Sequence, residues 1–234
     1  MMLAVKSLCG YYGQAQILND VSLDAMQGEV VALIGRNGAG KSTTLKAVIG
    51  LEARRKGSVI FDGCEVIGKP THEIVRMGLG YVPEERRIFS DLTVEENLAV
   101  GRRPPRPYTP QWTPETLYAL FPNLAEARKR PGGRMSGGEQ QMLTIARSLM
   151  GNPMMLMLDE PSEGLSPKIV EQMASAILRM KAEGLGIVVC EQNLHFAKLI
   201  SDRAYIIEKG EIRYGGTMAE LAADDEVRNT YLAV

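Results

Sequence analysis

Short apolar runs recur along the chain and are typical of strands that are buried on both faces. Such runs cover Val30–Ile34, Met154–Leu158 and Ile187–Val189. Each is followed by a turn and by a segment whose apolar residues have helical spacing, and this alternation predicts a parallel sheet wrapped by helices. Two later strands and a helical tail complete the expected order, around Tyr205–Ile207, Ile212–Tyr214 and Met218–Tyr231.

A second pattern lies on both sides of the first buried run. The segments Leu3–Ser7, Ile17–Asp24 and Ser58–Phe61, the last ending at the turn Asp62-Gly63, predict antiparallel strands. They indicate a small sheet beside the parallel core. The expected fold class is therefore α/β, with a parallel sheet core and an antiparallel β subdomain.

Between residues 84 and 150 the pattern is helical, apart from Gly101–Pro114, where five prolines exclude regular structure. This segment predicts a helical subdomain inserted into the fold. We expect a single domain over 1–234, in which 1–83 and 151–234 form the core with its β subdomain.

The composition fits a globular domain without a strongly basic surface. The 234 residues are 45% hydrophobic, and 27 Lys and Arg stand against 28 Asp and Glu, so no overall field favours nucleic acid. Cys9, Cys64 and Cys190 match no metal spacing, and we expect buried thiols in a reducing compartment. Because no leader or long apolar stretch is visible, we expect a chain that is neither secreted nor membrane-spanning.

One segment has the spacing G-x-x-x-x-G-K-S of a phosphate-binding loop, directly after Val30–Ile34 and before a helical segment. Its glycines let backbone N–H groups turn toward an anion, and the helix N-terminus adds positive charge. Lys41 is expected to reach the terminal phosphates and Ser42 a magnesium ion. The candidate nucleotide-binding residues here are Gly35, Asn37, Gly38, Ala39, Gly40, Lys41, Ser42 and Thr43. Transporter ATPases, small-molecule kinases and GTPases all use this loop.

Two adjacent carboxylates follow the run Met154–Leu158. Asp159 and Glu160 are therefore expected at the carboxyl edge of the sheet, where ligands bind in open α/β folds. Asp159 is expected to hold magnesium through water. Glu160, one residue on, is expected to point to the other side of the strand and to take a proton from the water that attacks the γ-phosphate.

The segment Ser136–Gln140 resembles the L-S-G-G-Q signature of the ABC ATPase family, with Met135 where leucine is usual. A serine is a good N-cap, two glycines allow close approach, and the helix over 139–149 directs its dipole at an anion. The segment lies about 20 residues before Asp159, as it does in the family. The resemblance implies nucleotide-binding roles for Ser136, Gly137, Gly138 and Glu139.

The resemblance to the ABC ATPases also implies a site shared by two chains. In that family, the signature of one subunit covers the γ-phosphate bound to the other subunit's phosphate loop, so that ATP with Mg²⁺ joins a dimer that reopens on hydrolysis. Tyr12 matches the aromatic residue that stacks on adenine. The implied activity is ATP hydrolysis coupled to transport.

Three residues depart from the usual family pattern. Glu84 stands where most members have a glutamine that senses magnesium and the attacking water, and an ionised carboxylate ligates metal but donates no hydrogen bond. Gln192 replaces a histidine that contacts the γ-phosphate, and Ser166 replaces an aspartate. The candidate catalytic residues are Glu160, Gln192 and Glu84, and the candidate metal ligands are Ser42, Asp159 and Glu84.

The motifs V-P-E, D-E-P-S-E-G-L-S-P and E-Q-N, at Val82–Glu84, Asp159–Pro167 and Glu191–Asn193, resemble the LivF-type ATP-binding subunits of branched-chain amino acid importers. This resemblance implies a second ATP-binding subunit of the LivG type, two transmembrane permeases and, indirectly, an external binding protein as partners. It implies a location at the cytoplasmic face of the cell membrane and no nucleic acid. An apolar pair, Ile88 and Phe89, is the expected docking site for a permease.

Other readings stay open at this point. Importers of urea or short amides use similar ATPase subunits, and substrate contacts reside in other chains. A soluble ABC ATPase that acts on nucleic acid or ribosomes could use the basic clusters Arg54–Lys56, Arg102-Arg103 and Arg128–Arg130, although these are more simply solvated faces and no sustained heptads are present. A small-molecule kinase would leave Ser136–Gln140 unexplained.

Overall fold

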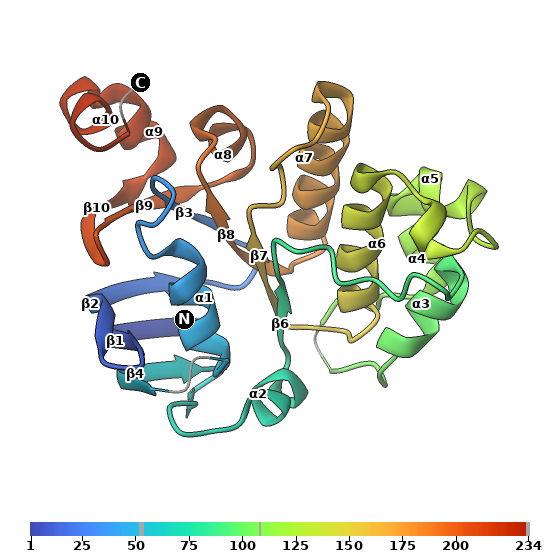
Figure 1. Cartoon of the computed structure of the whole chain (residues 1–234), viewed down its shortest axis with the longest axis horizontal. Coiled ribbons are helices and arrows are strands. Elements are labelled where there is room, and N and C mark those ends of the chain that lie inside the picture. Colours follow the sequence, from blue (N-terminus) through green and yellow to red (C-terminus); the bar gives the residue numbers. More distant parts are fainter. Residues whose placement is uncertain (52–53, 108, 233–234) are drawn as a thin grey trace.

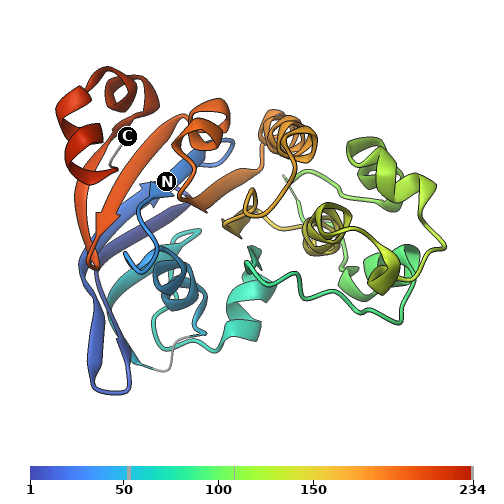
Figure 2. The ribbon, with the colours of Figure 1, turned by 45° about the horizontal axis from the view of Figure 1, so that its top comes forward.

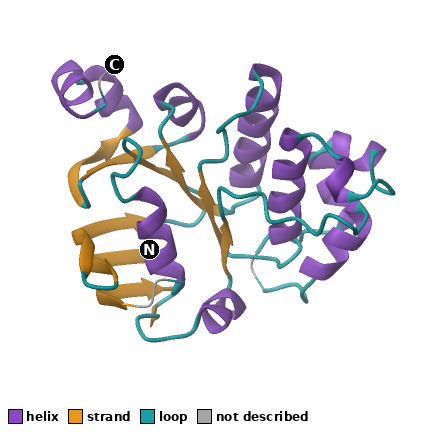
Figure 3. Cartoon of the chain, viewed as in Figure 1, coloured by secondary structure: helices purple, strands orange, loops and turns teal. Residues whose placement is uncertain are grey.

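The computed structural model describes residues 1–51, 54–107 and 109–232. Figure 1 shows the two sheets on one side of the molecule and a group of helices from the middle of the chain on the other, and Figure 3 shows that further helices lie against the sheets. Within the described ranges, no helix is long and apolar enough to cross a membrane.

The larger sheet has the strand order β10-β9-β3-β8-β7-β6. Its strands from β9 to β6 are parallel, as the apolar runs predicted, and the edge strand β10 pairs antiparallel with β9. The short strand β6 was not predicted. The strands are β3 (Val30–Ile34), β6 (Leu79–Val82), β7 (Met155–Asp159), β8 (Gly186–Glu191), β9 (Arg203–Glu208) and β10 (Glu211–Thr217).

The smaller sheet is antiparallel, with the order β2-β1-β4-β5, as predicted. Its strands are longer than the sequence pattern indicated, because ladder pairing continues beyond the apolar residues to the hairpin pair Tyr12 and Ala15. In Figure 1, helix α1 (Lys41–Ile49) lies between the two sheets. The strands are β1 (Leu3–Tyr12), β2 (Ala15–Ala25), β4 (Arg54–Phe61) and β5 (Cys64–Glu65).

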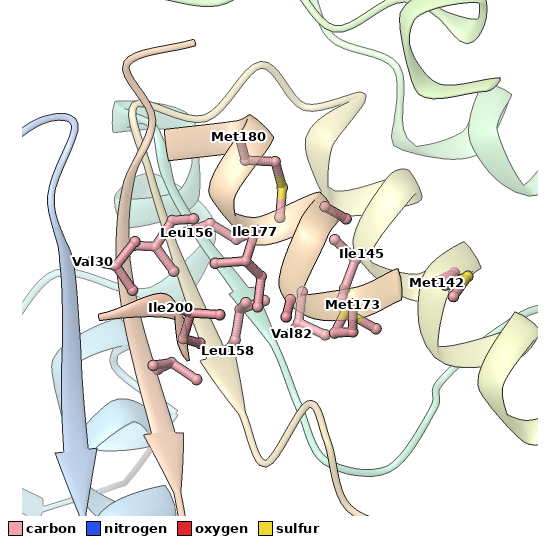
Figure 4. Close-up of a cluster of buried hydrophobic side chains, with 14 of the residues drawn as sticks. Val30, Val82, Met142, Ile145, Leu156, Leu158, Met173, Ile177, Met180 and Ile200 are labelled. Carbon is pink, nitrogen blue, oxygen red and sulfur yellow. The ribbon is translucent and has the colours of Figure 1, made fainter. Parts of the chain in front are cut away.

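Alternate side chains of the larger sheet enter two different cores, because successive residues of a strand point to opposite faces. Val30 of β3 packs in a core with α6, α7 and α8, whereas the next residue, Val31, packs in a core with α1 and the smaller sheet. Figure 4 shows Leu156 and Leu158 of β7 beside Ile177 of α7 in the first of these cores. The sheet is thus buried on both faces.

The helical region predicted over 84–150 contains α3 (Val94–Gly101), α4 (Pro114–Leu120), α5 (Pro122–Glu126), a 3-10 turn (Gly132–Arg134) and α6 (Gly137–Leu149). Figure 2 shows these helices at the opposite end of the molecule from the smaller sheet. The proline-rich stretch between α3 and α4 is irregular in its described part, and Tyr108 lies outside the described residues. The buried Asn152 anchors this stretch, because its side chain accepts a hydrogen bond from the backbone N–H of Trp112 and donates one to the carbonyl of Arg103.

Some expectations about the surface and the tail are wrong. Cys64 is exposed and Cys9 is partly exposed, so that Cys190 alone of the three is buried. Arg55 is not a solvated surface residue, since its guanidinium donates to carbonyls at the end of α1 and in the loop before α2, among them those of Ala47 and Val66.

The tail is broken at Asp224, which caps a separate helix. The remaining helices are α2 (Thr71–Met77), α7 (Pro167–Ala182), α8 (Leu194–Ile200), α9 (Met218–Ala223) and α10 (Asp225–Tyr231).

Candidate active site

The phosphate loop joins β3 to α1, in the strand–loop–helix context that its spacing predicted. Gly38 and Gly40 have φ angles of 78° and 111°, in the left-handed region that favours glycine. Helix α1 begins at Lys41, directly after the second of these glycines. The positive end of α1 therefore faces the loop.

A cavity of about 440 Å³ opens at the phosphate loop. Glu84 and Glu160, which are far from the loop in the sequence, line this cavity together with it. Glu163 also lines it and was not predicted, although it lies three residues after Glu160 in the same acidic motif. The lining residues are Ile17, Asn37, Gly38, Gly40, Lys41, Ser42, Thr43, Glu84, Glu160 and Glu163.

Lys41 and Glu160 form a buried ion pair. The Nζ atom of Lys41 lies 2.9 Å from Oε1 of Glu160, and the two side chains are 4% and 8% exposed. Lys41 also donates hydrogen bonds to the carbonyls of Gly35 and Arg36, at 2.8 and 3.1 Å. The cation thus lies beside both the loop and the candidate general base.

We expected strand alternation to set the direction of the Glu160 side chain. That expectation is wrong. Strand β7 ends at Asp159, and Glu160 has a φ of 48°, which is uncommon for a residue with a side chain. Its backbone N–H donates to the carbonyl of Cys190 at the end of β8. This left-handed turn accompanies the placement of the carboxylate against Lys41.

Both carboxylate oxygens of Asp159 accept hydrogen bonds from hydroxyl groups. Ser42 Oγ donates to Oδ1 at 2.9 Å, and the Tyr81 hydroxyl donates to Oδ2 at 3.1 Å. Burial raises the pKa of Asp159, and these two hydrogen bonds oppose that effect. A hydroxyl and a carboxylate side by side are hard oxygen donors that suit Mg²⁺, which takes one or two protein ligands together with phosphates. The described part of the chain contains no group of three or more His, Cys, Asp or Glu that could hold a metal ion.

Glu84 lies at the cavity beside a second acidic residue. Partial burial raises the pKa of Glu84, the nearby Glu163 raises it further, and Lys46 opposes the shift. Glu84 therefore has a weaker tendency to ionise than an isolated surface carboxyl group.

The signature segment forms the N-terminus of α6. Ser136 caps the helix, because its Oγ accepts from the backbone N–H of Glu139 at 3.3 Å, and Glu139 Oε2 accepts from the N–H of Ser136 at 2.8 Å. A hydroxyl that accepts in this way still has its own hydrogen to donate to an anion. A Cβ on Gly137 would lie 2.3 Å from Nη1 of Arg86, a contact that the sequence did not indicate.

The comparisons with known proteins agree with this geometry. The family model described as ABC transporter matches residues 18–163, which is more than half of the chain. The chain belongs to the ABC transporter ATP-binding family. ATP hydrolysis coupled to transport is the activity of this family, and the phosphate loop, the carboxylate pair and the signature of this ABC ATPase are all present.

Among the relatives of this ABC ATPase, the high-affinity branched-chain amino acid transport ATP-binding protein BraG of Pseudomonas aeruginosa is 44% identical and covers 99% of both chains. The lipopolysaccharide export system ATP-binding protein LptB of Haemophilus influenzae is 35% identical, over 99% of this chain and 97% of LptB. The probable branched-chain amino acid transport ATP-binding protein LivF of Archaeoglobus fulgidus is also 35% identical, over 100% and 99%. A solved ATP-binding subunit of an ABC transporter has a TM-score of 0.80 at 29% identity and covers 100% of this chain and 97% of that structure.

Several predicted residues of the ABC ATPase do not line the cavity formed by the described residues. Tyr12, the last residue of β1, is 47% exposed, and Ile17 from β2 lines the cavity instead. Gln192 is exposed just after β8. Ser136 caps α6, and Gly137, Gly138 and Glu139 form the first turn of that helix, away from the cavity lining.

Glu191 is an acidic residue near the site for which no role was predicted. It is 1% exposed, and its two oxygens accept hydrogen bonds from the backbone N–H groups of Ser162 and Asn193, at 3.1 and 3.3 Å. Burial is the main reason that the pKa of Glu191 is raised to about 7, and the charge of Glu160 contributes. The E-Q-N motif contained this residue, but its pattern gave no sign of burial.

The raised pKa predicts how stability depends on pH. Between pH 4.5 and about 7 the folded state keeps a proton on Glu191 that the unfolded state has lost, so stability falls as the pH rises through this window. We expect the free energy of unfolding of the native chain, relative to Glu191→Gln, to fall by up to about 3 kcal/mol between pH 5 and pH 8. Urea unfolding at both pH values measures this difference. An equal difference at both would contradict a raised pKa.

Proposed function

We propose that this ABC ATPase is the ATP-hydrolysing subunit of an importer of branched-chain, hydrophobic amino acids. The observation that carries the enzymatic part is the placement of Glu160 and Lys41 2.9 Å apart at the phosphate loop. The 44% identity to BraG over 99% of both chains supports the substrate class, because the export protein LptB is only 35% identical. The three LivF-type motifs support it as well.

In the proposed reaction, backbone N–H groups of the loop bind the phosphates and Lys41 pairs with the terminal ones. Glu160 accepts a proton from the water that attacks the γ-phosphate. Ser42 and Asp159, with Glu84, would hold Mg²⁺, which when bound would neutralise charge on the phosphate oxygens. Gln192 offers an amide donor toward the γ-phosphate.

A second chain completes the proposed nucleotide-binding site. Tyr12 stacks on adenine, and the segment Ser136–Glu139 covers the γ-phosphate bound to the partner's loop. We infer that the partner is a second ATP-binding subunit of the LivG type. We also propose a division into a core, over 1–83 and 151–234, and a helical subdomain, over 84–150. The order of the elements supports this division, because the phosphate loop precedes α1 and the signature begins α6.

A groove of about 1380 Å³ on the surface of the chain is the proposed docking site for a transmembrane permease at the cytoplasmic face of the membrane. Four arginines line it, at positions 76, 103, 106 and 147. Phe89 is 48% exposed, and the guanidinium of Arg147 lies 5.0 Å from the centre of its ring. This combination suits an amphipathic permease segment that carries an acidic residue.

The expectation that Ile88 and Phe89 form an exposed pair is wrong for Ile88. Its side chain is partly buried and packs against the first core, because the buried Asn97 fixes the preceding loop. The Asn97 side chain accepts from the backbone N–H of Phe89 and donates to the carbonyls of Phe89, Leu92 and Thr93. Phe89 alone is therefore the apolar contact of this loop with the groove.

We expect Phe89→Glu to abolish co-purification with the permeases, because it places a carboxylate where an acidic, apolar segment docks. Leu199→Glu is the matched control, since Leu199 is also 48% exposed but lies on α8 and does not line the groove. Pull-down of the tagged chain from solubilised membranes measures the effect. Equal permease recovery with both variants would rule out this groove as the docking site.

The function is tested by purifying the tagged Glu160→Gln chain with ATP from gently solubilised native membranes and identifying what accompanies it. We expect two permeases and a second ATP-binding subunit, and then uptake of leucine, isoleucine or valine that depends on this chain. Uptake of urea or short amides alone would reassign the substrate. Recovery of ribosomes or nucleic acid without a membrane protein would overturn the importer.

A further inference from the structure

Tyr81 connects the docking groove to the nucleotide site. It lies in β6, lines the groove, and its hydroxyl donates to Oδ2 of Asp159 at 3.1 Å. In the parallel ladder, Tyr81 lies opposite Met157, two residues before Asp159 in β7. One side chain therefore contacts both the proposed permease surface and the carboxylate beside Ser42.

The hydroxyl of Tyr81 is a permanent donor. A phenol with its ordinary pKa of about 10 is protonated at neutral pH, so it can donate to a carboxylate. Ser42 occupies the other oxygen, Oδ1, at 2.9 Å. The two hydroxyl groups thus hold the plane of the Asp159 carboxylate from both sides, and Oδ1 is the oxygen on the side of the phosphate loop.

We propose that Tyr81 is a positioning residue for the magnesium carboxylate, and that a segment seated in the groove acts on Asp159 through it. Removing the hydroxyl frees the carboxylate to rotate and leaves a buried oxygen without its donor, which weakens a metal site without touching the phosphate contacts. The positioning role depends only on the family activity, whereas the link to the groove rests on the proposed permease docking.

The first test uses the isolated chain and the non-hydrolysable analogue AMP-PNP, with binding measured by calorimetry. We expect Tyr81→Phe to raise the Mg²⁺ concentration that half-saturates magnesium-dependent nucleotide binding by about 10-fold. Affinity for AMP-PNP in EDTA stays unchanged, because the loop and Lys41 are intact. The control is Tyr205→Phe, which removes a comparable hydroxyl contact, to Asp24 Oδ1 at 2.8 Å, away from the cavity.

An equal loss of affinity with and without Mg²⁺ would overturn the positioning role and leave a general structural one. An unchanged Mg²⁺ requirement would overturn it as well. Neither result depends on which solute is transported. The importer proposal is tested separately, by the pull-down from solubilised membranes.

The second test compares the isolated chain with the complex that carries the permeases. We expect the Mg²⁺ concentration for half-saturation to differ between the two for the native chain and to be the same for Tyr81→Phe. If the native chain shows no such difference, the link between the groove and Asp159 is refuted, and the positioning role is judged by the first test alone.

Discussion

Glu160→Gln is expected to slow ATP hydrolysis at least about 100-fold, the usual scale for the loss of a general base. The amide has nearly the same shape but cannot accept the proton of the attacking water. ATP binding is expected to persist and to become tighter, because the variant removes the anion that lies 2.9 Å from Lys41 and competes with the phosphates for it. Single-turnover hydrolysis and equilibrium ATP binding measure the two effects separately.

Glu163→Gln is the control for this variant, because Glu163 also lines the cavity. The ion pair with Lys41 is formed by Glu160. We expect a loss of less than about 10-fold for it, since it changes the charge of the cavity but not the proton acceptor. Turnover by Glu160→Gln at the native rate would remove Glu160 from the chemistry. Equal losses in the two variants would point to cavity charge as the cause.

Lys41→Ala is expected to weaken ATP binding by about 10- to 100-fold, because a charge-assisted contact to phosphate contributes about 1.5–3 kcal/mol. The ion pair adds a second cause. The carboxylate of Glu160 is 8% exposed in the native chain. In the variant it would have no cation beside it and would have the phosphates as new neighbours. Equilibrium binding of ATP to the purified chain measures the loss.

The double variant Lys41→Ala with Glu160→Gln separates these causes. We expect it to recover part of the lost affinity, because it removes the anion that repels the phosphates along with the cation that attracts them. A double variant that binds as weakly as Lys41→Ala would show that the ion pair plays no part. An unchanged affinity in Lys41→Ala itself would contradict the cradle at the phosphate loop.

Features that depend on neighbouring residues in the chain were predictable from the sequence. The spacing of the phosphate loop, the apolar strand before it and the helix after it are contiguous, so local backbone preferences determine them. The same holds for the cap that Ser136 and Glu139 form at the start of α6. Strand ends were less predictable, because pairing with a neighbouring strand, as at Tyr12, extends β1 beyond its apolar pattern.

The contacts that make the site work depend on residues far apart in the chain. The Lys41–Glu160 pair, the hydrogen bond from Tyr81 to Asp159 and the burial of Glu191 arise where separate strands end at one sheet edge. Periodicity places a residue on a face but does not state which distant atoms share its environment or how much water reaches it. The sequence by itself determined the chemistry that this ATPase carries, and only the packed sheet decided the charges, proton affinities and partners of its groups.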